Sequence, residues 1–335
     1  LGSDSFTFTE GDAATVIDQS TAAVLADVDS SNFAGGNLTV TITSGEDSAE
    51  DVLSLSTSGA VALASTSANA NVSVGGTVVG TLANAIAAGN DLVVNLNSAA
   101  TAANVQTLVR AITYQNTDTD NPTTGARVVR TTINDGDGGT SANADVTVTV
   151  AAVNDAPVVS GAGATLAYTE NASATVIDAD LTLSDVDSNN LTGATVTISE
   201  NFQSGGEDVL AFTAAGGSNI TGSFNNSTGV LTLSGTTTKA LYEQTLESVT
   251  YQNTSDTPST SARTITWQVN DGSGANNLSS AVTSTVAVAA VNDVPTIANL
   301  GSDSFTFTEG AAATVIDQST AAVLADVDSS NFAGG

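Results

Sequence analysis

Carboxylate and carboxamide side chains recur at equivalent places along this chain. Each repeat of the pattern holds a Glu near its start, an Asp-Val-Asp triplet, an Asn-Asp-Gly triplet and a Val-Asn-Asp-x-Pro segment. The members are Glu10, Glu170 and Glu309; Asp27, Asp29, Asp185, Asp187, Asp326 and Asp328; Asn134, Asp135, Asn270 and Asp271; and Asn154, Asp155, Asn292 and Asp293. Converging carboxylates repel one another unless a cation neutralises them. These side chains could therefore bind metal.

The available donors restrict which metal that would be. The chain has no His and no Cys, which removes the usual ligands of transition metals. Oxygen donors favour Ca²⁺, which accepts six to eight of them in flexible geometry, whereas Mg²⁺ requires a stricter octahedron. We therefore expect Ca²⁺ as the cofactor.

A plainer interpretation of these residues competes with metal binding. Asp, Asn and Gly are common turn residues, and acidic surfaces also aid solubility. This interpretation suffices for a single Asp. For Glu50 and Asp51, and for Glu207 and Asp208, a loop that leads into a strand explains the acids as well as metal binding does. Turns alone do not require the same acids twice, so the repeated set favours ligation.

Internal repeats position these residues. Residues 1–36 and 300–335 differ only at Asp12, which is Ala311 in the second copy. A weaker repeat lies inside this long one, since ITYQNTDTDNP (112–122) matches VTYQNTSDTP (249–258) and VTVTVAAVNDAP (146–157) matches STVAVAAVNDVP (284–295). We expect repeat A at residues 1–156, repeat B at 157–295 and an incomplete further copy of A at 296–335. The extra residues of repeat A fall in the region 60–100.

Apolar periodicity predicts an all-β fold. Leu38, Val40 and Ile42 alternate with polar residues, and the same period of two recurs near the end of each repeat, as expected for strands with one buried face. Tandem Greek-key β-sandwich domains are favoured, with an eight-stranded jelly roll as the alternative. Helical spacing at Val105, Leu108, Val109 and Ile112, and at Tyr242, Leu246 and Val249, predicts one short helix per repeat.

Composition excludes several functions. Asp and Glu total 35 against five Lys and Arg, for a net charge of −30, which disfavours nucleic acid and anionic membranes as partners. The chain holds no apolar run long enough to span a bilayer. An enzyme is not expected, because catalysis requires a singular cleft and every acidic cluster here is repeated.

The incomplete third copy allows two interpretations. Thirty-six residues cannot form a sandwich core alone. The sequence is then either a window on a longer tandem array, which we favour, or its last strands complete a neighbouring molecule by strand addition.

The ordered set DVDS, NDG and VNDAP resembles the calcium-binding pattern of cadherin repeats, and more closely the bacterial cadherin-like repeats of giant extracellular adhesins and repeats-in-toxin proteins. The resemblance covers nearly the whole chain. It implies an immunoglobulin-like sandwich with Ca²⁺ at the junctions between repeats. The first junction would use Glu10, Asn154, Asp155, Asp185, Asp187 and Asp271, and the second would use Glu170, Asn292, Asp293, Asp326 and Asp328. Asp27, Asp29 and Asp135 are further candidate metal ligands.

The resemblance also implies a function. We expect a segment of an extracellular stalk, filament or adhesin at a bacterial cell surface, stiffened by Ca²⁺, with neighbouring copies of the repeat as partners. The alternative is a Ca²⁺-dependent module that binds a receptor, a surface glycan or the matrix.

Overall fold

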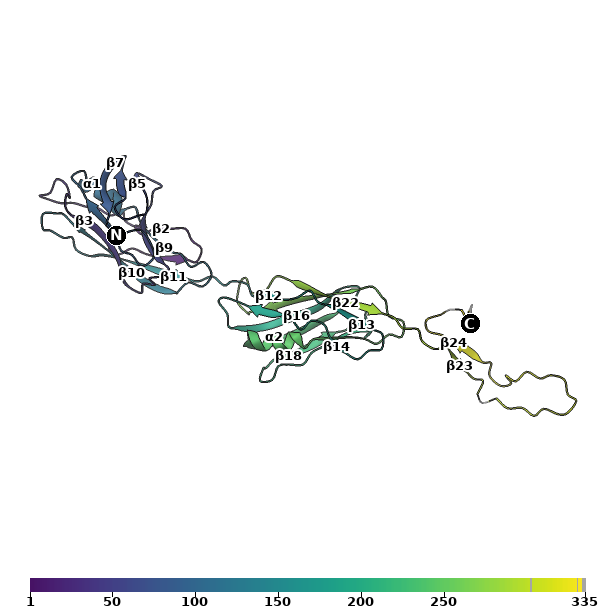
Figure 1. The fold of residues 1–335 in the computed structure, drawn as a ribbon. Helices are drawn as coiled ribbons and strands as arrows, with labels where there is room; N and C mark the ends of the chain where they lie inside the picture. Colours follow the sequence, from purple (N-terminus) through teal and green to yellow (C-terminus); the bar gives the residue numbers. More distant parts are fainter. Residues whose placement is uncertain (302, 330, 333–335) are drawn as a thin grey trace. The chain divides into compact units, whose positions relative to one another are not determined.

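The chain folds into two compact units, Leu1–Val153 (unit 1) and Asn154–Gly335 (unit 2), each described here by itself. The structure is a computed structural model that describes residues 1–301, 303–329 and 331–332 (Figure 1). Both units consist mainly of β-strands, as the alternation of apolar and polar residues predicts. The boundary between the units lies inside the first Val-Asn-Asp-x-Pro segment, directly after Val153, and Asn154 and Asp155 bond to loops of unit 2.

Unit 1 is a β-sandwich with one large and one small sheet. The large sheet has the order β1-β11-β10-β3-β8-β7-β6-β5, and the small sheet has the order β2-β9-β4. The strands are β1 (Ser5–Thr9), β2 (Thr15–Val16), β3 (Asn37–Ser44), β4 (Asp51–Leu55), β5 (Val61–Leu63), β6 (Asn71–Val74), β7 (Thr77–Leu82), β8 (Leu92–Leu96), β9 (Ile112–Asn116), β10 (Gly125–Asn134) and β11 (Ala144–Ala151).

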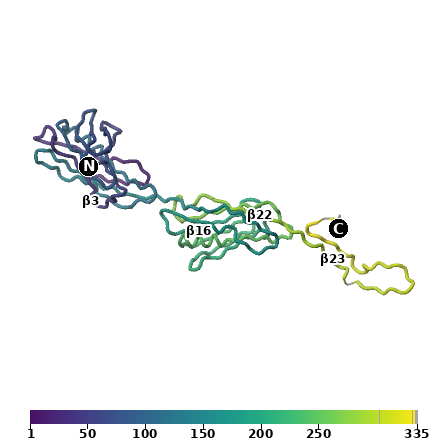
Figure 2. Tube along the Cα trace, viewed as in Figure 1, coloured from purple at the N-terminus to yellow at the C-terminus, as the bar shows by residue number. Residues whose placement is uncertain are grey.

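Unit 2 repeats this architecture with fewer strands at one edge. Its large sheet has the order β13-β22-β21-β16-β19-β18, beside the sheets β14-β20-β17 and β12-β15. The strands are β12 (Val158–Ser160), β13 (Thr165–Thr169), β14 (Thr175–Val176), β15 (Thr182–Ser184), β16 (Asn190–Glu200), β17 (Asp208–Ala211), β18 (Thr221–Asn225), β19 (Val230–Thr238), β20 (Thr250–Asn253), β21 (Arg263–Asn270) and β22 (Val282–Ala289). The tube in Figure 2 locates β16 and β22.

The first strand of each large sheet runs parallel to the last. Ser5 pairs with Thr147 between β1 and β11, and Thr165 pairs with Thr285 between β13 and β22. Neighbouring strands in these sheets are otherwise antiparallel, as in a Greek-key sandwich. The prediction of tandem all-β sandwiches is confirmed. The additional residues of repeat A form β5 and β6, which extend one edge of its large sheet.

One short helix closes each core. Helix α1 (Ala102–Val109) begins after the N-cap Thr101, and α2 (Lys239–Glu247) begins after the N-cap Thr238. Val105 and Leu108 of α1, and Tyr242 and Leu246 of α2, are buried. The helices are where the apolar spacing predicts them, although the predicted last position of the first helix, Ile112, already belongs to β9.

The period-two positions form the cores. Leu38 and Val40 are fully buried in unit 1, while Ile265 and Trp267 are fully buried in unit 2. The Trp267 indole donates to Ser284 Oγ at 2.9 Å, so its polar atom is satisfied inside the core. Unit 2 also includes a two-stranded sheet of β23 (Thr296–Ala298) and β24 (Val323–Ala325).

Candidate metal centre

Three carboxylates converge at one end of the unit 2 sandwich. One oxygen from each of Glu170, Asp256 and Asp293 lies within 4.8 Å of the others. Glu170 directly follows β13, Asp256 lies in the loop after β20, and Asp293 lies in the segment after β22. The sandwich therefore brings together acids from three separate loops.

Hydrogen bonds within unit 2 hold Glu170 in place. Its backbone N–H donates to the carbonyl of Ala289 at 2.9 Å, which extends the parallel pairing of β13 and β22. Its Oε2 accepts from the N–H of Val291 at 2.8 Å. The side chain is only 4% exposed, and Oε1 is buried without a hydrogen-bond partner among the described residues. Buried polar atoms are nearly always bonded, so this oxygen is suited to binding a cation.

Asp293 experiences the repulsion that this crowding predicts. Its N–H donates to the Asp328 carboxylate, and its Oδ2 is buried with no hydrogen-bond partner in the described part of the chain. Burial raises the pKa of Asp293, and the charges of Asp328, Glu170, Asp256 and Asp326 raise it further. A divalent cation would relieve this crowding.

The Asp-Val-Asp triplets form one recurrent turn. Asp326 Oδ1 accepts from the N–H groups of Asp328 at 3.0 Å and Ser329 at 2.9 Å. Asp185 and Asp27 accept equivalent bonds from the residues two and three positions ahead. These bonds, led by that of Ser30, lower the pKa of Asp27. In each triplet the first Asp holds the turn, which places the second.

The second Asp of the triplet contacts the Asn-Asp segment of the same unit. The Asp155 N–H donates to Asp187 Oδ2 at 2.5 Å, in the way that the Asp293 N–H donates to Asp328. Asp185 Oδ2 is buried with no hydrogen-bond partner within the described ranges. The same geometry therefore occurs at both ends of unit 2.

Asn154 connects this group to Asp271. Its Nδ2 lies 2.8 Å from Asp271 Oδ2, and its Oδ1 accepts from Ser273 Oγ at 2.6 Å. Asp271 is 8% exposed, and its Oδ1 accepts from the Ser273 N–H at 2.7 Å. Asn154, Asp155, Asp185, Asp187 and Asp271 thus lie in one network. The side chain of Asn154 acts in it mainly as a donor.

The remaining predicted residues bond or lie within their own unit. Glu10 Oε2 accepts from the Val153 N–H at 2.7 Å, as Glu170 does from Val291. Asp27 and Asp135 line one small hollow of about 200 Å³, and Asp29 belongs to the Asp27 turn. Asn292 Nδ2 donates to the Asp293 carbonyl at 2.6 Å.

Sequence reasoning missed Asp256. Its segment YQNTSDTP matches YQNTDTDNP in repeat A, which indicates a recurrent acidic loop but not its proximity to Glu170.

The Asp of each acidic pair, at the first position of β4 or β17, is buried in an ion pair. Asp208 and Arg263 are both fully buried, and Asp208 Oδ2 lies 3.1 Å from Arg263 Nε. Tyr251 donates to Asp208 Oδ1 at 2.5 Å. Asp51 and Arg127 form the equivalent pair in unit 1, also at 3.1 Å. Asp51 and Asp208 are thus held in internal salt bridges.

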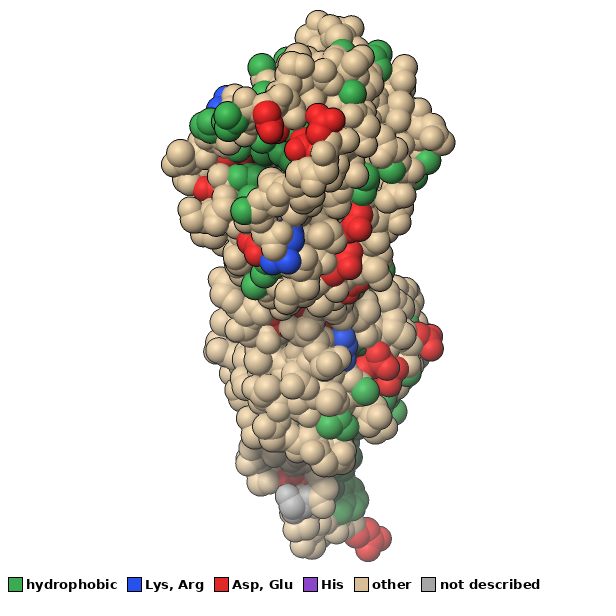
Figure 3. Space-filling model, turned by 90° about the vertical axis from the view of Figure 1, so that its left-hand side faces the viewer, with side chains coloured by type: hydrophobic (Ala, Val, Ile, Leu, Met, Phe, Trp, Pro, Cys, Tyr) green, Lys and Arg blue, Asp and Glu red, His purple; other side chains and the backbone are tan. Residues whose placement is uncertain are grey.

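The donor set fits a hard divalent cation. Its members are carboxylate oxygens, and two of them, Glu170 Oε1 and Asp293 Oδ2, are buried with no hydrogen-bond partner among the described residues. Ca²⁺ takes six to eight such oxygens, so this cluster could supply part of a calcium shell. Acidic side chains elsewhere are scattered over the face drawn in Figure 3 in small groups. Among the described residues, the structure has no helix long and apolar enough to cross a membrane.

No protein-family model matches the chain. Halomucin of Haloquadratum walsbyi (strain DSM 16790 / HBSQ001) is 38% identical over 112 residues, which cover 32% of this chain and 1% of that protein.

The structural neighbours are cadherin domains. Mouse cadherin-23 EC22-24 is 14% identical, with a TM-score of 0.32 over 88% of this chain and 66% of that chain. The protocadherin gammaB7 EC3-6 cis-dimer structure is 11% identical, with a TM-score of 0.31 over 90% of this chain and 49% of that chain. The chain thus spans about half of that protocadherin. The assignment of the fold rests on the strand order and register of the two units.

Proposed function

We propose that this chain is a segment of an extracellular stalk or adhesin, whose sandwich modules are stiffened by Ca²⁺ bound between the end of one module and the start of the next. The observation that carries the proposal is the convergence of Glu170, Asp256 and Asp293 beside a buried, unbonded carboxylate oxygen. Neighbouring repeats of the same kind are the expected partners, and a cell surface is the expected location.

The mechanism is electrostatic. Without a counter-ion, Asp293 and its acidic neighbours repel one another, and the segment after β22 is free to move away from Glu170. When bound, Ca²⁺ supplies positive charge that all these oxygens can share. Glu170 anchors the site through Val291, Asp293 carries the linker, and Asp328, which lies in the further repeat that follows the linker within unit 2, contacts Asp293. Binding to the folded form alone stabilises it by mass action.

The other predicted ligands extend the proposal by internal repetition. Asp155, Asp185 and Asp187 repeat the arrangement of Asp293, Asp326 and Asp328. That Glu10 joins them, and that Asp27, Asp29 and Asp135 serve another ion, stay predictions.

A calcium titration tests the proposal. The thermal melting of unit 2 is measured in EGTA and in Ca²⁺ for the parent and for Glu170→Gln and Asp293→Asn. We expect Ca²⁺ to raise the melting temperature of the parent and to have a much smaller effect on both variants. Glu200→Gln is the matched control, because Glu200 is exposed and lies outside the cluster. Equal responses in the parent and both cluster variants would refute the assignment.

Small-angle scattering separates a stalk from a binding module. If Ca²⁺ stiffens the chain, EGTA changes the scattering profile of the parent and changes that of Asp293→Asn less. If Ca²⁺ only assists a glycan or receptor site, chelation abolishes ligand binding and leaves the profile unchanged.

A further inference from the structure

A lysine contacts the Asp-Val-Asp turn of unit 2. Lys239 is the single Lys of the chain and the first residue of α2. Its Nζ donates to the backbone carbonyls of Asp185 and Ser188, at 2.6 Å each. Its backbone N–H donates to the Asn189 carbonyl at 3.1 Å. One residue of the helix therefore bonds three times to the turn that places Asp187.

The charge of this lysine is held by carbonyl oxygens. Lys239 belongs to none of the salt bridges found among the described residues. Glu243, one helical turn further along α2, accepts instead from the Leu183 N–H at 2.8 Å. The Lys239 ammonium group is thus bound in the way that a free cation would be, by two oxygens of the turn.

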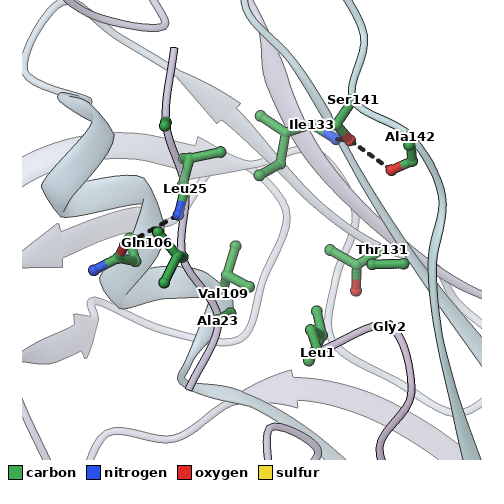
Figure 4. A pocket seen from close by; sticks show the side chains of 13 residues that line it. Leu1, Gly2, Ala23, Leu25, Gln106, Val109, Thr131, Ile133, Ser141 and Ala142 are labelled. Atoms are coloured by element: carbon green, nitrogen blue, oxygen red, sulfur yellow. Dashed lines mark hydrogen bonds between the residues drawn. The ribbon is translucent and has the colours of Figure 1, made fainter. Parts of the chain in front are cut away.

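Unit 1 has no charge at this place. Helix α1 begins at Ala102 directly after its N-cap, as α2 begins at Lys239 after its own. Ala102 therefore takes the position of Lys239. Figure 4 shows the helix contact that unit 1 does have, in which Gln106 Oε1 accepts from the Leu25 N–H at 3.0 Å. Gln106 is neutral, whereas α2 has Glu243 at the corresponding position.

The turn itself does not require a lysine. In unit 1, Asp27 Oδ1 accepts from the N–H groups of Asp29 and Ser30. Asp185 Oδ1 accepts the same two bonds in unit 2. Because the turn forms in unit 1 beside an alanine, the first Asp of the triplet is sufficient to hold it. The specific contribution of Lys239 to unit 2 is therefore a positive charge beside the acids.

Four acids near this charge form the Asp185 group, whose members are Asp155, Asp185, Asp187 and Asp271. Asp187 Oδ2 accepts from the Asp155 N–H at 2.5 Å, and Asp185 Oδ2 is buried with no hydrogen-bond partner in the described part of the chain. The Lys239 ammonium contacts the backbone of Asp185 itself. It therefore offsets part of the repulsion among these carboxylates whether or not a metal ion is bound. The same charge repels a divalent cation that enters the group.

We propose that Lys239 is a resident counter-ion, which lowers the Ca²⁺ affinity of the Asp185 group and holds that group together when Ca²⁺ is absent. The inference rests on the proposed function, since it takes the Asp185 group to bind Ca²⁺. Lys239 is not a ligand, and it acts on the ion through its charge alone. The Asp185 group then binds Ca²⁺ more weakly, and depends on it less, than the same acids with a neutral residue at position 239.

A calcium titration of unit 2 tests this inference in the full chain. Each variant also carries Asp293→Asn, which weakens the cluster of Glu170, so that the smaller response that remains is that of the Asp185 group. Trp267 is the single Trp and is buried in unit 2, so its fluorescence reports the melting of that unit. The rise of the melting temperature with Ca²⁺ concentration then gives the affinity.

The decisive variant is Lys239→Met, which keeps the length of the side chain and removes its charge. In about 10 mM salt, where charges act over about 30 Å, we expect it to bind Ca²⁺ at least about threefold more tightly than the chain with Lys239. In EGTA it should melt at a lower temperature, because the acids then repel one another without a counter-ion.

Three controls separate charge from structure. Lys239→Arg keeps the charge and should keep the affinity of the chain with Lys239. Arg110→Met removes an exposed base in unit 1 and should leave the calcium response of unit 2 unchanged. In about 1 M salt, where the screening length is about 3 Å, the affinity gain of Lys239→Met should disappear, because salt screens charges and does not restore lost hydrogen bonds.

The results distinguish this inference from the proposed function. A parent chain whose melting does not respond to Ca²⁺ at all would refute both. If the parent responds, a Lys239→Met affinity equal to or weaker than that of the chain with Lys239 would overturn the inference alone. An Asp293→Asn chain without any calcium response would also overturn it, since the Asp185 group would then bind no ion. An affinity gain that persists in about 1 M salt would do the same, because it would not be electrostatic.

Discussion

Replacing Asp208 with Asn should unfold unit 2 at markedly lower denaturant concentration. Asp208 and Arg263 are fully buried. The carboxylate accepts from Arg263 Nε at 3.1 Å and Nη2 at 3.2 Å, from Tyr251 OH at 2.5 Å and from Asn253 Nδ2 at 2.8 Å. Asn keeps the shape and removes the charge, which leaves the Arg263 guanidinium buried without a counter-ion.

The size of the effect follows from this burial. Removing one partner of a buried ion pair costs about 3–5 kcal/mol, whereas an exposed pair contributes about 0–1 kcal/mol. A loss of this size lowers the melting temperature of a domain of this length by about 10 °C.

Trp267 makes the assay specific. It is the single Trp of the chain and is buried in unit 2, so its fluorescence in a urea titration reports the unfolding of that unit. Asp51→Asn, which breaks the equivalent pair with Arg127 in unit 1, serves as the control and should leave the Trp267 transition unchanged. A loss below about 1 kcal/mol for Asp208→Asn would refute the reasoning, since that is the range of solvated pairs.

Three further predictions concern unit 2. The pKa of Asp293 is raised, so the folded protein holds the proton of this carboxyl more tightly than the unfolded chain does. In EGTA, the contribution of protonated Asp293 to stability is therefore present at low pH and is lost as the pH rises through the folded pKa. Asp293→Asn should therefore melt like the parent near about pH 3 and above it near about pH 7 in EGTA, measured by calorimetry. Gly161→Ala should lower the free energy of unfolding by more than about 2 kcal/mol in urea titrations, because φ is 78° and the new Cβ would lie 1.8 Å from the Asp180 carbonyl oxygen. An unchanged unfolding midpoint would contradict this geometry. Thr238→Ala should lower the free energy of unfolding by about 1 kcal/mol in the same titration, because the Thr238 hydroxyl accepts from the Leu241 N–H at the start of α2. A loss of about 3 kcal/mol, or no loss, would contradict a capping role.

The sequence predicts the sandwiches because their determinants are local. Alternation around Ile265, Trp267 and Val269 indicates which face is buried, and the structure buries all three. The helical spacing at Val105 and Leu108 likewise predicts α1 correctly. It fails at Ile112, where pairing with Leu55 of β4 begins a strand instead. Short-range periodicity therefore indicates the elements better than their ends.

Convergence of distant side chains is harder to predict. Asp256 belongs to a loop whose path depends on how β20 packs, so its approach to Glu170 is not visible in a local pattern. Asp51 looks like a turn residue, yet its partner Arg127 lies 76 positions away and takes it into the core. The repeated acids indicate where a site could form, and the fold decides which of them meet.

The central claim concerns one ion, and its location can be measured directly. Crystals of the chain grown with Ca²⁺ should give an anomalous-difference peak about 2.3–2.6 Å from oxygens of Glu170, Asp256 and Asp293, the usual calcium–oxygen distances. Such a peak is what the crowded, partly unbonded carboxylates predict. A well-ordered map in which these three side chains contact only water, with no anomalous signal near Glu170, would contradict the account.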